Sequence, residues 1–190
     1  MSSARRPLPT DLVALITHDG RVFPNEAKTW DRMGAEDSGP HPLGAALEQW
    51  LSFATGKHTW VSVHGATIRG LVSARRRAKR SAWEVDCLIN ADEDRSIAGS
   101  LLERMAVDIG RQGAERVFLR VAADSSLVEI ARSAGFFAYA RETLCRADDP
   151  FPVDDPGLPL RPATKTDAFG IFQLYNAVTP ANVRAIEGLT

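Results

Sequence analysis

The sequence predicts an α/β domain with a mixed β-sheet flanked by helices, followed by the start of a second, similar domain. Apolar and polar residues alternate with the period of a strand over much of residues 59–90, and the apolar period changes to that of a helix from Arg95. The strand–helix–strand order of residues 83–122 is typical of a right-handed crossover, which places both strands in one sheet. Apolar residues make up 44% of the 190 residues and charged residues 25%, which is ordinary for a folded globular protein.

The N-terminal part is expected to contribute one strand and two helices. Residues 11–17 read as a strand, and residues 24–56 are predicted to be helical in two pieces. In the second piece, Pro42 suits a first helical turn and Gly56 supplies a stop. Its apolar positions fall on one helical face: Leu43, Leu47, Trp50, Leu51 and Ala54.

A β-hairpin and a further strand are predicted next. Residues 59–63 alternate, His64 and Gly65 suit a tight turn, and residues 66–74 run back. The basic stretch 75–80 is interpreted as a turn of solvated charge, and residues 83–90 as the next strand.

The period then becomes helical up to Gly113. Residues 117–122 are predicted to form a strand, residues 125–134 a short helix that ends at Gly135, and residues 136–146 a last strand. The apolar positions of the long helix are Ile97, Leu101, Leu102, Met105, Ala106 and Ile109.

A linker and a short tail complete the chain. Residues 148–159 contain four prolines, which is a linker composition. After it, residues 160–163 read as a short strand, and Thr166 is expected to cap a helix. About 30 residues are too few to bury a core alone, so the tail either docks on the first domain or begins a larger unit. The helix carries an apolar stripe, which predicts poor solubility or self-association: Ile171, Phe172, Leu174, Tyr175 and Val178.

Composition argues against several classes of protein. The net charge of −1 gives no bulk attraction to nucleic acid or to an anionic membrane. No apolar run approaches the roughly 18 residues of a membrane helix. Cys87 and Cys145 form no metal-spaced or redox pair, so we expect a reducing, cytoplasmic location. The four histidines have no metal-ligand spacing, and no metal is expected.

The order of elements over residues 59–146 resembles the GNAT superfamily of N-acetyltransferases. It has a hairpin, a strand, a helix led by small residues, a strand, a short helix that ends in Gly135-Phe136, and a last strand. Residues 160–168 look like the opening strand and helix of a second domain of this type. The resemblance implies a GNAT-like domain at 1–147, a linker at 148–159 and part of a second domain at 160–190.

The resemblance also implies a reaction and a coenzyme. The family moves an acetyl group from acetyl-CoA to an amine, here an unidentified small-molecule or peptide acceptor. The pyrophosphate motif of the family falls on residues 93–98, where the basic residue has become Glu93 and the first glycine Ser96. Acids before a helix also simply cap it, and that alternative stays open. The implied coenzyme contacts are Leu88, Ile89, Arg95, Ser96, Ile97, Ala98, Gly99 and Ser100.

Candidate catalytic residues follow from the chemistry of acyl transfer. Glu84 and Asp86 lie two apart on the strand before the helix, so they share a face, and a paired carboxylate could serve as the base. A solvent-facing polar row is the alternative. The family's tyrosine acid falls on Ala131 here, so water or Tyr139 is left to protonate the thiolate.

These departures leave a second functional hypothesis open. The first domain is either an acyl-CoA-dependent N-acyltransferase or a non-catalytic module that supports a catalytic second domain. A third possibility, a phosphate or nucleic-acid binder that uses residues 75–80, is disfavoured by the net charge near zero.

Overall fold

The computed structural model of the chain describes residues 3–8, 10–11, 24–29, 56–65, 67–77, 81–91, 94–143, 145 and 161–187. The chain divides into two compact units, Met1–Phe137 and Ala138–Thr190. The strand predicted at 11–17 lies outside the described residues except for Asp11, as do the linker and most of the two N-terminal helices.

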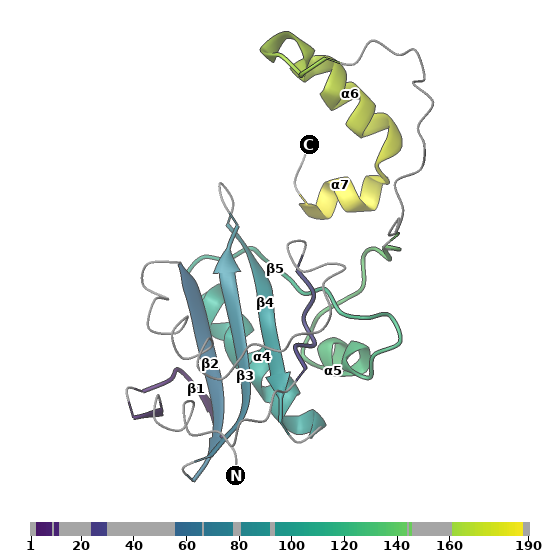
Figure 1. Cartoon of the computed structure of the whole chain (residues 1–190). Helices are drawn as coiled ribbons and strands as arrows, with labels where there is room; N and C mark the ends of the chain where they lie inside the picture. The colour runs from purple at the N-terminus through teal and green to yellow at the C-terminus, as the bar shows by residue number, and fades with distance from the viewer. Residues whose placement is uncertain are drawn as a thin grey trace. The chain divides into compact units, whose positions relative to one another are not determined.

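The first unit is built on a five-stranded mixed sheet in the order β1-β2-β3-β4-β5 (Figure 1). Neighbouring strands are antiparallel from β1 to β4, and β5 is parallel to β4. The predicted α/β class with a mixed sheet is therefore confirmed. The strands are β1 (Ser3–Arg5), β2 (Lys57–His64), β3 (Thr67–Arg76), β4 (Ala82–Asn90) and β5 (Arg116–Phe118).

The hairpin prediction is also confirmed, because β2 and β3 pair from Lys57–Arg75 to His64–Thr67. Gly65 has a φ of 61° in the connection, in the left-handed region that glycine enters without strain. β1 was not predicted. It has only three residues, too few to show a periodic pattern.

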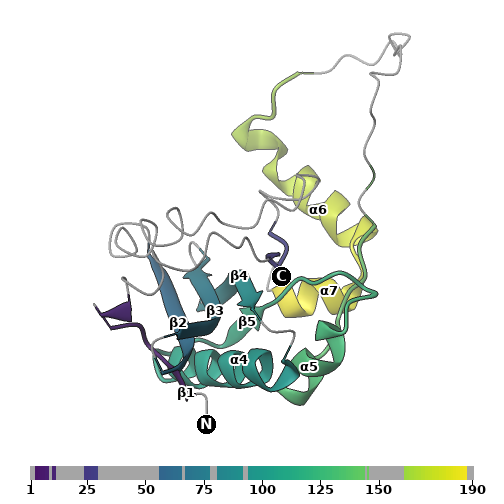
Figure 2. The ribbon, with the colours of Figure 1, turned by 60° about the horizontal axis from the view of Figure 1, so that its bottom comes forward.

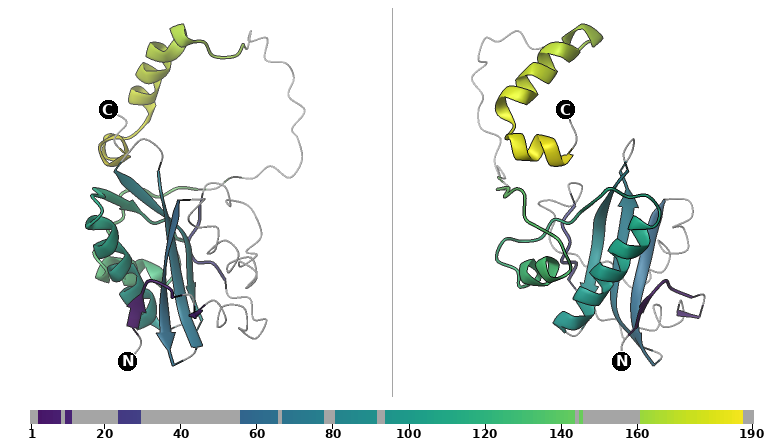
Figure 3. Two further views of the ribbon diagram at one scale, coloured as in Figure 1. Left: turned by 90° about the vertical axis from the view of Figure 1, so that its left-hand side faces the viewer. Right: turned by 180° about the vertical axis from the view of Figure 1, so that it is seen from behind.

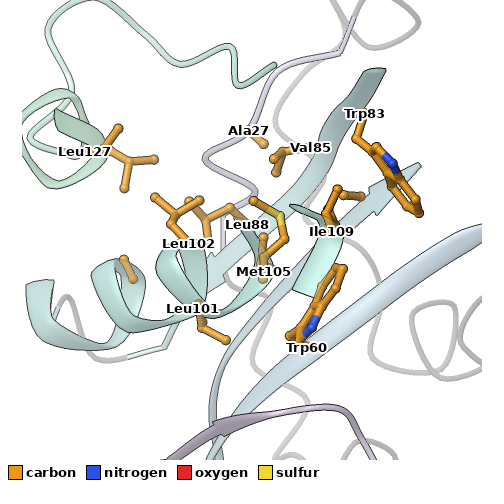
Figure 4. Packing of buried hydrophobic residues seen from close by; sticks show 14 of the residues in the cluster. Ala27, Trp60, Trp83, Val85, Leu88, Leu101, Leu102, Met105, Ile109 and Leu127 are labelled. Atoms are coloured by element: carbon orange, nitrogen blue, oxygen red, sulfur yellow. The ribbon is translucent and has the colours of Figure 1, made fainter. Parts of the chain in front are cut away.

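One long helix, α4 (Arg95–Gly110), packs on one face of the sheet (Figures 2 and 3). Its apolar positions, spaced three and four apart, meet side chains from β2, β3 and β4 in the main core (Figure 4). Every member of this set is fully or almost fully buried: Trp60, Val72, Val85, Leu88, Leu101, Leu102, Met105 and Ile109.

The elements after α4 are shorter than predicted. β5 ends at Phe118 rather than at residue 122, and α5 covers Leu127–Ser133. The strand expected at 136–146 is wrong for residues 136–143 and 145, which form no strand. The Tyr139 carbonyl accepts a hydrogen bond from Asn182 in α7 (Ala181–Glu187), so this carbonyl bonds a helix side chain instead of a neighbouring strand.

The second unit begins its helical part with a 3₁₀ turn, η2 (Lys165–Asp167), which leads into α6 (Ala168–Val178). Thr164 and Asp167 form a capping box, so Thr164 and not the predicted Thr166 is the cap. Residues 161–163 form no strand. The predicted apolar helix is present, and of its stripe Ile171, Phe172, Leu174 and Val178 are exposed, whereas Tyr175 is half-buried. None of the described helices combines the length and the apolar character that a membrane crossing demands.

Candidate functional site

The sheet opens between β4 and β5. Parallel pairing is limited to three positions, from Ala82–Arg116 to Glu84–Phe118, whereas β4 continues to Asn90. Among the described residues, no strand pairs with this edge of β4 beyond Glu84. α4 begins at Arg95, just after the carboxyl end of β4. A crevice where strands diverge beside a helix N-terminus is where α/β proteins bind ligands.

Residues 24–29 occupy this opening beside β4 (Figure 1). The Asn25 side chain donates to the Asp86 carbonyl at 3.1 Å and accepts from the Leu88 amide at 2.9 Å. The Glu26 amide donates to the Leu88 carbonyl at 2.9 Å, and the Lys28 amide donates to the Arg120 carbonyl at 2.8 Å. The segment therefore bridges β4 and the chain that follows β5.

The helical prediction is wrong for residues 24–29, which form neither helix nor strand. The amides of Glu26 and Lys28 bond to the sheet and its continuation instead of to carbonyls four residues back. Ala27 is buried in the main core next to Val85 and Leu88 (Figure 4). Tertiary contacts here override local helix propensity.

A β-bulge lies at the candidate base residues. The register between β3 and β4 shifts so that Ser73 faces Cys87 while Ala74 faces Val85, which leaves Asp86 as the extra residue. Val85 packs in the core on the α4 side. Because neighbours along a strand point to opposite faces, Glu84 and Asp86 point away from α4, as the sequence predicts.

Asp86 is held by two polar partners. Its side chain accepts from the Ser73 hydroxyl at 2.8 Å and pairs with the Lys57 ammonium at 3.0 Å. The residue is only 5% exposed. The interpretation of this row as solvent-facing is therefore wrong.

Glu84 is similarly buried, at 7% exposure, and its partners among the described residues are arginines. Its carboxylate lies 3.3 Å from the Arg120 guanidinium, 3.6 Å from that of Arg77 and 3.9 Å from that of Arg75. Arg77 also stacks over the Phe118 ring at 4.2 Å. The described part of the basic stretch is thus partly committed to Glu84, not wholly to a solvated turn.

The N-terminus of α4 is capped by Asp94. Its carboxylate accepts from the Ser96 amide at 2.9 Å and the Ser96 hydroxyl at 2.7 Å, and its carbonyl accepts from the Ile97 amide. These bonds to Ser96, with a smaller contribution from the Arg69 charge, lower the pKa of Asp94. In the observed conformation the amides of Ser96 and Ile97 are thus used for capping of α4 by Asp94, which is the alternative to phosphate binding that the sequence left open.

The remaining predicted coenzyme residues differ in what they present. Arg95 and Ser96 are exposed at the start of α4, whereas Ile97 and Ala98 are buried under it. A Cβ added to Gly99 would lie 3.7 Å from Ile130 Cγ2, which is an ordinary van der Waals distance. Packing against Ile130 therefore does not require a glycine at this position. Leu88 is fully buried, so only its backbone faces the opening, and Ile89 packs in the smaller core on the opposite face from α4.

Tyr139 belongs to the second unit. Its hydroxyl donates to Glu187 of α7 at 2.9 Å. The structure therefore places Glu84, Asp86 and Leu88 along β4 and the start of α4 just after its carboxyl end, all in the first unit, and the role of Tyr139 stays a prediction. Among the described residues, no group of three or more His, Cys, Asp or Glu side chains is placed to hold a metal ion.

Sequence reasoning missed Asn25, Ser73, Lys57 and Arg120, which hold the site together. Pro24 before Asn25 was a signal, since the residue before or at a proline often marks an extended segment. No local pattern pointed to the other three, because their partners lie far away in the sequence.

Several solved structures share this fold. An acetyltransferase from Trypanosoma brucei aligns with 77% of this chain and 100% of its own, with a TM-score of 0.52 and 16% identity. A protein from Desulfovibrio desulfuricans, described as an acetyltransferase of the GNAT family, aligns with 74% of this chain and 87% of its own, with a TM-score of 0.50 and 15% identity.

A third structure contains a ligand. AAC(6')-Iy, in complex with the bisubstrate analogue CoA-S-monomethyl-acetylneamine, aligns with 77% of this chain and 98% of its own, with a TM-score of 0.52 and 12% identity. No protein-family model matches the chain, and no curated protein matches its sequence significantly. At these identities the likeness establishes the fold: the chain has the α/β fold of the GNAT superfamily of N-acetyltransferases.

Proposed function

We propose that the first unit transfers an acyl group, in the first instance acetyl, from acyl-coenzyme A to an amine. The observation that carries this proposal is the opening of the sheet between β4 and β5 beside the N-terminus of α4. It occurs in a fold shared with acetyltransferases, one of which was solved with a coenzyme A bisubstrate analogue. The acceptor is a small-molecule or peptide amine.

In this proposal the amine nitrogen attacks the thioester carbonyl carbon, the carbon–sulfur bond breaks, and the amine loses a proton to a base. We assign the base to Asp86 in preference to Glu84. The Asp86 carboxylate lies against one ammonium and one hydroxyl, whereas the Glu84 carboxylate is surrounded by three guanidinium groups and is less accessible to an amine. Water returns a proton to the coenzyme thiolate.

The start of α4 fits the phosphates of the coenzyme only in part. Arg95 is exposed there, and the small, half-buried residues Gly99 and Ser100 allow close approach. The amide of Ser96, however, is already bonded to the Asp94 carboxylate. In this proposal Arg95 and the backbone of residues 96–100 hold the phosphates after Asp94 has turned away from Ser96.

The first test is a thermal-shift titration of the full chain with acetyl-CoA. A ligand present at 100 times its Kd stabilises the folded state by about 2.7 kcal/mol. A melting temperature that stays constant up to millimolar acetyl-CoA, both in the wild type and in variants that open the site, argues against the proposal.

The second test addresses the base. Asp86→Asn is expected to slow acyl transfer to a panel of amines by about 10²–10⁴-fold, with an unchanged Kd for acetyl-CoA. Asp108→Asn is the matched control, because Asp108 pairs with Arg104 on α4 away from the opening. Equal loss in both variants would point to a structural role for Asp86.

A specific observation also favours the second functional hypothesis, a non-catalytic module. The groups of β4 that face the opening are bonded to residues 24–29, and Asp94 caps α4. If this arrangement is permanent, the first unit supports another domain and binds no acyl-coenzyme A. The experiments of the next section separate the two hypotheses.

A further inference from the structure

The open edge of β4 is occupied by the chain itself. Beyond the last pair with β5, the Asp86 carbonyl, the Leu88 amide and the Leu88 carbonyl all bond to Asn25 or Glu26. Asn25 is 6% exposed and Ala27 is 2% exposed, so the segment fills the opening and does not merely cross its rim. Any ligand that needs these β4 groups competes with residues 24–29.

The group that Asn25 contributes has the same chemistry as such a ligand. Its primary amide donates to one β4 carbonyl and accepts from one β4 amide, as an added strand or an amide-bearing chain does. The arm of coenzyme A that carries the thioester contains amide groups. One side chain therefore satisfies the same donor and acceptor that the ligand's amides would meet.

We infer that residues 24–29 form an autoinhibitory segment, which excludes acyl-coenzyme A from the β4 edge and must be displaced before it binds. This inference rests on the proposed function. Asn25 is its main contact, and the amides of Glu26 and Lys28 complete it through Leu88 and Arg120. Displacement frees the Leu88 amide, a fixed donor for the charge that develops on the thioester oxygen.

The inference predicts a weakened apparent affinity in the wild type. The apparent Kd equals the intrinsic Kd divided by the fraction of molecules in which the segment is displaced. A substitution that weakens only the closed state therefore lowers the apparent Kd. In Asn25→Asp, the side chain keeps its shape but replaces its donor to the Asp86 carbonyl with a charged acceptor.

The experiment compares acetyl-CoA binding to the full-length wild type, Asn25→Asp and Asn25→Ala by isothermal titration calorimetry. We expect the Kd of each Asn25 variant to fall by at least tenfold. Asn176→Asp is the matched control, since its amide donates to the Phe172 carbonyl within α6 of the second unit. The control is expected to bind acetyl-CoA with the wild-type Kd.

Hydrogen exchange supplies a second readout that does not depend on a substitution. With saturating acetyl-CoA, the amides of Glu26 and Lys28 are expected to exchange faster, while amides in the middle of α4 stay protected. The inference is supported if the amides of Glu26 and Lys28 exchange faster and the Asn25 variants bind acetyl-CoA more tightly than the wild type. It is also supported if the Asn25 variants bind acetyl-CoA and the wild type does not.

The opposing outcomes are also distinct. If the wild type binds acetyl-CoA and neither Asn25 variant binds more tightly, while the amides of residues 24–29 stay protected, autoinhibition is wrong and the proposed function stands. If the variants remain folded by circular dichroism and no form of the protein binds acetyl-CoA, both proposals are wrong and the non-catalytic module is favoured.

Discussion

Gly70 offers a sharp test of how α4 sits on the sheet. It lies in β3, and a Cβ added to it would come within 2.8 Å of Ile97 Cγ2 and 3.0 Å of Leu101 Cδ1, both on α4. The same Cβ would lie 3.0 Å from the Ile89 carbonyl oxygen of β4. The two side chains belong to the buried core, and the carbonyl is fixed by the sheet, so none of the three yields freely.

The expected effect of Gly70→Ala is the difference between two contributions. Overpacking a well-filled core costs about 1–3 kcal/mol. Replacing glycine by alanine at an allowed backbone conformation returns about 0.4–1 kcal/mol through the unfolded chain. Taking the middle of each range, about 2 and about 0.7 kcal/mol, we expect the free energy of unfolding of the first unit to fall by about 1.3 kcal/mol.

Urea denaturation followed by tryptophan fluorescence measures this change. All four tryptophans precede Ala138, and the first unit ends at Phe137, so the signal reports on that unit. Gly110→Ala is the matched control, because Gly110 ends α4 and an added Cβ there meets nothing within 4 Å. It is expected to be neutral or stabilising by up to about 1 kcal/mol. Equal stability of Gly70→Ala and wild type would refute the close approach of α4 to β3.

Two further predictions concern the ends of the chain. Hydrogen bonds from the Arg5 guanidinium and the Leu8 amide lower the pKa of Asp11. The contribution of ionised Asp11 to the free energy of unfolding, about 1 kcal/mol, is therefore present above about pH 4 and is lost as the pH falls further. The difference in free energy of unfolding between wild type and Asp11→Asn should narrow from pH 7 to pH 3, and a constant difference contradicts this. Leu174 is 62% exposed on α6, on the same side of the helix as the exposed Ile171 and Val178. Light scattering should therefore detect concentration-dependent self-association that Leu174→Glu reduces. A monodisperse wild-type monomer at all concentrations would contradict this.

Elements with a strong local pattern were predicted from the sequence. The β2–β3 hairpin, β4 and α4 each present alternation or helical periodicity over eight or more residues, and each lies where expected. Predictions failed where a long-range partner decides the backbone. Residues 136–143 belong to the predicted last strand, yet the Tyr139 carbonyl bonds to Asn182. Residues 24–29 bond to β4 and Arg120 in place of forming a helix.

The candidate site shows the same division. That Glu84 and Asp86 share a face follows from the strand period alone, but their burial depends on partners that are distant in sequence, Lys57 for Asp86 and Arg120 for Glu84. The capping role of Asp94 was an open alternative at the sequence level, because an acid before a helix is compatible with both readings. Capping and phosphate binding are distinguished only by the positions of the Ser96 amide and hydroxyl, which both donate to the Asp94 carboxylate.

The two functional hypotheses share one fold and differ in the free energy that is needed to displace residues 24–29 from β4. The hydrogen bonds that join residues 24–29 to β4 and to Arg120 include two made by the Asn25 side chain and one each donated by the amides of Glu26 and Lys28. At about 1 kcal/mol net for each, these four bonds favour the closed segment by at most about 4 kcal/mol, because ordering the segment costs conformational entropy. The apparent Kd of a competing ligand is then raised by up to about a thousandfold. A transferase whose segment is displaced before acyl-coenzyme A binds and a module whose segment never leaves thus share one structure, and the acetyl-CoA affinity of Asn25→Asp decides between them.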